Sequence, residues 1–150
     1  MANNTKELRT PFFLVDEGLV RENLEILRQV AEEAGCKILL AQKAFSMFRL
    51  YPLMRQYLAG STASGLYEAR LGREEFGGET HVYSPAFRPE EMEELLGYVD
   101  HIVFNSPAQL KKFGPAAKAA GKQVGQPLKP QCCTQEGQAN YDPYAPGSLV

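Results

Sequence analysis

Hydrophobic and polar positions follow two alternating patterns along the first 125 residues. Short apolar, β-prone runs predict strands, and segments with an apolar residue at every third or fourth position predict helices between them. The expected strands are Phe12–Asp16, Lys37–Gln42, His81–Ser84, His101–Ser106 and Lys122–Gly125. The expected helices are about Val20–Ala34 (closed by Gly35), Phe45–Leu58, Leu66–Phe76, Arg88–Tyr98 and Pro107–Ala120.

This strand-and-helix rhythm predicts an α/β protein with a parallel sheet, either open and doubly wound or closed as a barrel. The stretch GSTASGLY has the glycine spacing of a P-loop at Gly60 and Gly65. Leu66 and Tyr67 stand where a P-loop needs lysine and serine or threonine, so we interpret the stretch as a strand-to-helix turn. Beyond Gly125 the rhythm fails. We expect one domain over residues 1–125 and an irregular, proline-rich tail over residues 126–150.

Composition narrows the class of protein without identifying it. The chain has 150 residues, 44% of them hydrophobic, and a net charge of −2, which gives no reason to expect a nucleic-acid partner. No apolar run reaches the roughly 20 residues that span a membrane, and the start lacks a signal-peptide pattern. We therefore expect a cytoplasmic protein without a membrane partner. The three cysteines lack the spacing of a zinc site, so no metal is predicted.

Strand polarity sorts the polar residues into two groups. In parallel α/β folds, the chemistry gathers at the carboxyl ends of the strands. The polar residues expected at or just past the carboxyl ends are Asp16, Lys43, Ser61, Ser64, Ser84, Asn105 and Ser106. His81 and His101 fall at strand starts, which argues against either as a catalytic base. Glu68 and Arg70, early in a helix, are interpreted as surface residues.

Lys43 is open to two interpretations. A lysine at a strand end often only extends to solvent. An amine desolvated at the end of a buried strand has a lowered pKa, and its free lone pair suits Schiff-base formation. Residue types alone leave both alternatives standing.

A family resemblance favours the second alternative. The segments TPFFLVDEGLVRENLEIL, KILLAQKAFSMF, STASGLYEARLG, HVYSPAF and HIVFNSPAQL occur in order between about Thr10 and Gly125. Together they resemble carboxynorspermidine decarboxylase, of the alanine racemase-like group. The resemblance implies a (β/α)₈ barrel that binds pyridoxal 5'-phosphate (PLP) through Lys43, with Ser61, Ser64 and Ser84 lining the cofactor pocket. It also implies a polyamine substrate and, for full-length members, a homodimer.

The resemblance has two departures. It covers well under half of a family member, as an N-terminal, incomplete part of the PLP-binding barrel with about five to six βα units over residues 1–125, and the β domain is not included. The family pattern Leu-Arg-Ile-Asn-Pro is replaced by Gln126-Pro127-Leu128-Lys129-Pro130, and a proline argues against a central strand.

The leading interpretation is PLP-dependent decarboxylation of carboxynorspermidine or carboxyspermidine in polyamine biosynthesis. We expect the 150-residue chain alone to be inactive. The alternatives are an inactive fragment or another barrel of the same group, such as a racemase or diaminopimelate decarboxylase.

Overall fold

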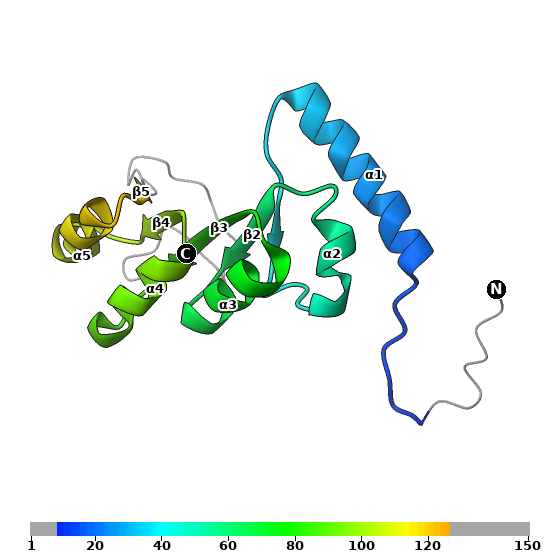
Figure 1. Cartoon of the computed structure of the whole chain (residues 1–150), viewed down its shortest axis with the longest axis horizontal. Helices are drawn as coiled ribbons and strands as arrows, with labels where there is room; N and C mark the ends of the chain where they lie inside the picture. The colour runs from blue at the N-terminus through cyan, green and yellow to red at the C-terminus, as the bar shows by residue number, and fades with distance from the viewer. Residues whose placement is uncertain (1–8, 127–150) are drawn as a thin grey trace, which may run out of the picture.

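The computed structural model describes residues 9–126 of the chain, and its secondary structure alternates strand and helix (Figure 1). The strands are β1 (Leu39–Ala41), β2 (Gly60–Ala63), β3 (Glu79–Ser84), β4 (His101–Phe104) and β5 (Gln123–Gly125). The helices are α1 (Glu17–Ala34), α2 (Tyr51–Met54), α3 (Leu66–Leu71), α4 (Met92–Tyr98) and α5 (Pro107–Ala119). Short 3₁₀ segments, η2 (Phe48–Leu50) and η4 (Pro89–Glu91), lead into α2 and α4, and a π-helical turn, η3 (Gly72–Phe76), extends α3.

The five strands form one parallel sheet in the order β1-β2-β3-β4-β5, which is also their order in the chain. Each strand therefore pairs with the strand that precedes it by one helix. The expectation of a parallel α/β sheet is confirmed. The uniform order, without the reversal that marks a doubly wound sheet, favours the barrel alternative.

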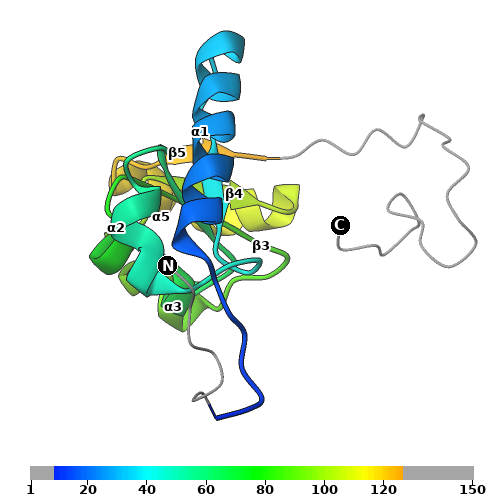
Figure 2. The ribbon, with the colours of Figure 1, turned by 90° about the vertical axis from the view of Figure 1, so that its right-hand side faces the viewer.

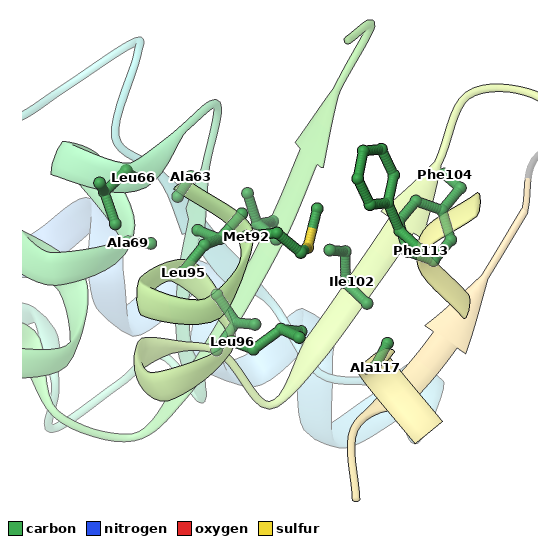
Figure 3. Close-up of a cluster of buried hydrophobic side chains, with 12 residues drawn as sticks. Ala63, Leu66, Ala69, Met92, Leu95, Leu96, Ile102, Phe104, Phe113 and Ala117 are labelled. Carbon is green, nitrogen blue, oxygen red and sulfur yellow. The ribbon is translucent and has the colours of Figure 1, made fainter. Parts of the chain in front are cut away.

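The main hydrophobic core lies between the sheet and helices α3, α4 and α5 (Figure 3). Val82, Ile102 and Phe104 are fully buried on the helix-covered face of β3 and β4. Leu95 of α4 and Phe113 of α5 pack against them. Burying an aliphatic or aromatic side chain contributes about 1.5–3 kcal/mol, so this layer is the principal source of cohesion in the described chain.

Helix α1 packs far less completely than the other helices. Asp16 caps its start by accepting hydrogen bonds from the backbone amides of Gly18 and Leu19, and Gly35 ends it with a left-handed φ of 62°. Leu24 is its only fully buried residue. Figures 1 and 2 show the helix projecting away from the body of the molecule.

An expected strand, an expected turn and an expected helix differ from the structure. Phe12–Asp16 is irregular, because no strand of the described chain pairs with it. Gly60–Ala63 is a strand, not a turn, since the absence of a Gly60 side chain allows β2 and β3 to pair closely. The helix expected over Phe45–Leu58 is shorter, from Phe48 to Met54. The expected tail lies outside the described residues except for Gln126.

Candidate functional site

Side chains on successive strand positions point to opposite faces of the sheet. On the face away from the helices, the register places one residue of each strand beside a residue of the next strand. Ala41 lies opposite Thr62, Thr62 opposite His81, and His81 opposite His101. These residues are half-buried, in contrast to the fully buried residues on the helix-covered face. Within residues 9–126, the face away from the helices is therefore the more exposed of the two.

Lys43 lies two residues after the end of β1, at the carboxyl edge of the sheet. The amides of Ala44 and Phe45 both donate to the carbonyl of Ala41, at 2.9 and 3.2 Å, and close a turn around Lys43. The side chain lines a cavity of about 100 Å³ whose walls are Ala41, Lys43, Thr62, Ala63, Ser64 and Tyr83, here termed the Lys43 hollow. Lys43 is exposed, so residues 9–126 do not supply the desolvation expected for its amine.

Ser64 and Ser84 also lie at the carboxyl edge. Both line a second cavity of about 270 Å³, which adjoins the Lys43 hollow because Ser64 belongs to both. The Ser84 hydroxyl donates to the carbonyl of Ala86 at 2.9 Å. The structure thus brings Lys43, Ser64 and Ser84 to one edge of the sheet.

Ser61 does not join them. It lies within β2, opposite Thr80, and is fully buried on the face that packs against α3 and η3. A Cβ added to Gly72 would approach its hydroxyl oxygen to 2.4 Å, so the π-helical turn lies directly over it. A contact between Ser61 and a ligand in the Lys43 hollow is incompatible with this placement.

A buried hydrogen-bond network supports the residue before Lys43. The Gln42 amide donates to the carbonyl of Glu68 at 2.8 Å and to the Ser61 hydroxyl at 3.4 Å, and its oxygen accepts from the Tyr51 hydroxyl at 3.3 Å. Burial and the negative charge of Glu68 raise the pKa of Tyr51, which keeps the phenol protonated as a donor. Since Gln42 is held on both its amide atoms, the backbone that carries Lys43 has little freedom.

Glu68 was interpreted from sequence as a surface residue, and the structure gives it two contacts near the site. The backbone carbonyl of Glu68 accepts a hydrogen bond from the Gln42 side-chain amide, and its carboxylate accepts one from the backbone amide of Ser64 at 2.6 Å. Tyr83, missed in the sequence, lines the Lys43 hollow and donates to Asn105 at 2.8 Å. Tyr83 follows Val82 on β3, so the two side chains point to opposite faces of the sheet. Knowing that Val82 faces the helices would have placed Tyr83 on the open face.

The amino edge of the sheet has a different chemistry. Arg73 pairs with Asp100 at 2.8 Å, and the other carboxylate oxygen of Asp100 accepts from the amide of Thr80 at 2.8 Å. Lys37 pairs with Glu79, which also contacts His81. At this edge, charged side chains therefore link β3 to the segments that precede β1 and β4, and η3 to the segment that precedes β4.

The strand order and the one-sided layer of helices define a class of structure, a five-strand segment of a (β/α)₈ barrel. A crystal structure of carboxynorspermidine decarboxylase complexed with norspermidine, from Campylobacter jejuni, matches 78% of this chain with a TM-score of 0.75 and 38% identity. The match covers 31% of that protein.

Curated sequences agree with the structural match. The chain is 42% identical over 123 residues to a carboxynorspermidine/carboxyspermidine decarboxylase of Herminiimonas arsenicoxydans. It is 36% identical over 143 residues to a carboxyaminopropylagmatine decarboxylase of Synechocystis. These matches cover 82% and 95% of this chain, and the chain spans about a third of each relative (33% and 37%). The resemblance deduced from sequence motifs is confirmed over that portion.

Two further observations bear on the class of protein. No family model matches the chain. Among residues 9–126, every helix is too short or too polar to cross a membrane.

Proposed function

We propose that this chain forms part of a PLP-dependent enzyme that decarboxylates carboxynorspermidine or carboxyspermidine in polyamine biosynthesis. The observation that carries the proposal is the position of Lys43, at the carboxyl edge of a barrel segment that is 38% identical to a carboxynorspermidine decarboxylase. Catalytic groups in barrels of this type come from the carboxyl ends of the strands.

The residues at this edge suit the aldehyde group of PLP. An accessible amine is the group that binds the PLP aldehyde, and Lys43 is exposed within a hollow that also holds Ser64 and Tyr83. Ser64 follows β2 and Ser84 ends β3, so their hydroxyls would supply hydrogen bonds to the cofactor from two neighbouring strands. The Lys43 hollow is small compared with the several hundred Å³ of a complete ligand site, so these residues form one wall of the pocket.

Each residue has a defined task in the proposed site. PLP, when bound, supplies an electron sink for the pair released as the substrate carboxylate leaves. Lys43 would hold the cofactor through its amine, and that amine, when the substrate amine displaces it, would be placed to exchange a proton with the substrate at the reacting carbon. Gln42, fixed by Tyr51 and Glu68, positions the backbone of Lys43.

Trapping with borohydride tests the lysine assignment directly. Mixing the chain with PLP, reducing it and mapping the labelled peptide by mass spectrometry is expected to place the label on Lys43. The matched control is Lys111, an exposed lysine on α5, whose replacement by alanine is expected to leave the labelling unchanged. Equal labelling of both lysines, or labelling that persists after Lys43→Ala, would contradict the proposal.

A chimera tests the activity. Residues 9–126 would replace the matching segment of the Campylobacter jejuni enzyme, and CO₂ release from carboxynorspermidine would be measured. We expect measurable turnover, with Lys43→Ala reducing it by at least about three orders of magnitude. A folded chimera that binds PLP and shows no turnover would contradict the assigned substrate class while leaving the lysine assignment intact.

A further inference from the structure

Three potential metal ligands meet on the open face of the sheet, towards its amino edge and apart from the Lys43 hollow. His81 of β3 lies opposite His101 of β4 in the sheet register, and Glu79 precedes His81 by two positions, so it shares its face. The ligand atoms of the three residues all lie within 4.8 Å of one another. They are the only such group of histidine, cysteine or acidic side chains in the part of the chain that the structure describes.

The spacing of these atoms suits a small divalent ion. Tetrahedral zinc bonded at about 2.0–2.1 Å places its ligand atoms roughly 3.4 Å apart. The Glu79 carboxylate oxygen is 3.1 Å from His81 Nε2 and 4.0 Å from His101 Nε2, values on either side of that separation. The two imidazole rings stack with centroids 3.9 Å apart, and both direct Nε2 towards the same carboxylate oxygen. A small rotation of each ring would open space for an ion.

The ionisation states also suit a metal. Hydrogen bonds from Lys37 and His81 lower the pKa of Glu79, so its carboxylate is ionised at neutral pH. Burial, together with the nearby His81, lowers the pKa of His101, which favours the neutral imidazole that binds metals. The side chains of His81 and His101 are 24% and 26% exposed, sufficient for an ion to enter. The opposing charge is Lys37, whose amine contacts the other oxygen of Glu79.

We propose that Glu79, His81 and His101 form a binding site for a divalent transition metal, with Zn²⁺ as the preferred ion. Two imidazoles and one carboxylate are a ligand set that zinc uses, and the remaining coordination position is filled by water. Because the ligands come from β3 and β4, the metal ties these two strands together. Three protein ligands and a water leave one position of the metal open to exchange, and its place towards the amino edge, the end of barrel strands that mainly serves stability, assigns it a stabilising role.

Calorimetric titration with Zn²⁺ tests the site. The full chain would carry Cys36, Cys132 and Cys133 replaced by serine, which removes thiol binding. The chain has two histidines, both in the cluster, so histidine-dependent binding reports on this site alone. One equivalent is expected to bind, with a higher melting temperature in Zn²⁺ than in a chelator. Co²⁺ is expected to give the visible spectrum of a tetrahedral site.

Three variants identify the ligands. His101→Ala and Glu79→Gln are each expected to weaken Zn²⁺ binding at least about tenfold and to abolish the rise in melting temperature. Glu93→Gln, which removes an exposed acid on α4, is the matched control and is expected to bind as the parent does. Lys37→Ala is expected to bind several-fold more tightly, because it removes the opposing charge.

Circular dichroism of each variant establishes that it is folded. No Zn²⁺ binding by the folded parent would overturn the proposal and leave the cluster as a hydrogen-bonded and stacked pair. Equal binding by the parent and the folded His101→Ala variant would also overturn it.

Discussion

The two edges of the sheet differ in how their side chains are used. At the amino edge, Asp100 joins Arg73 to the backbone of Thr80, and Glu79 joins Lys37 to His81. At the carboxyl edge, Lys43 and Ser64 are exposed around a cavity. The same five strands therefore carry a cross-linked edge and an open one.

The difference shows how one sheet can be both stable and available to a ligand. Side chains at the amino edge contact one another, so they contribute to cohesion, and the metal ion proposed there would add a further link between strands. The exposed side chains at the carboxyl edge contribute little to cohesion, which leaves their polar groups available for binding. Substitutions at matched positions on the two edges are therefore expected to have unequal effects.

The largest difference is expected between Gly60, the first residue of β2, and Gly65, which lies just past its carboxyl end. A Cβ at Gly60 would lie 1.9 Å from the backbone oxygen of Glu79, a contact that only displacement of β3 can relieve. Gly60→Ala is expected to lower the free energy of unfolding by at least about 3 kcal/mol. A Cβ at Gly65, past the carboxyl end, meets nothing within 4 Å, so Gly65→Ala is expected to cost about 1 kcal/mol or less. Urea unfolding measures both, and equal costs would remove the distinction between the edges.

An intermediate difference is expected for the polar residues that flank β4. Asp100→Ala removes the hydrogen bond to Thr80 and the pair with Arg73, and is expected to cost about 1–2 kcal/mol because the pair is partly exposed. Asn105→Ala removes one hydrogen bond from Tyr83 and is expected to cost about 0.5–1 kcal/mol. Urea unfolding measures both costs. A larger loss of stability for Asn105→Ala than for Asp100→Ala would contradict the distinction between the two edges.

The smallest effect on stability is expected for the serines of the carboxyl edge. Ser64→Ala and Ser84→Ala are expected to change the free energy of unfolding by about 0.5 kcal/mol or less. Borohydride trapping of PLP at Lys43 is nevertheless expected to weaken by about fivefold, the value of one hydrogen bond. Ser106→Ala is the control, because Ser106 caps α5 and lines neither of the two cavities. Trapping that falls with Ser106→Ala and stays constant with Ser64→Ala would contradict the proposed pocket.

Much of the fold is predictable from local pattern. The periodicity of α1 and its termination at Gly35 depend on residues close in the chain, and the structure confirms both. Phe12–Asp16 shows where local pattern fails, since a β-prone run becomes a strand only when it has a partner. For Gly60–Ala63 the local pattern predicts a turn where the structure has a strand. Its small residues have low strand propensity, and the segment pairs with β3 through close approach of the backbones.

The candidate site is predictable in part for the same reason. The position of Lys43 after an apolar strand follows from the sequence alone. The direction of Ser61 depends on which face of β2 meets the helices, and a shift of one residue reverses it. The cluster of Glu79, His81 and His101 depends on the register between β3 and β4, two strands separated by a helix. No local pattern contains that register.

The strand order described above also has a consequence for how the chain acquires its structure. Each strand from β2 to β5 pairs with the strand made just before it, so each new strand–helix unit can join the sheet as soon as it is synthesised. Such short sequence separations favour rapid folding, because little loop entropy is lost before a contact forms. A ribosome extending this chain would therefore add β1 to β5 to the sheet one strand–helix unit at a time.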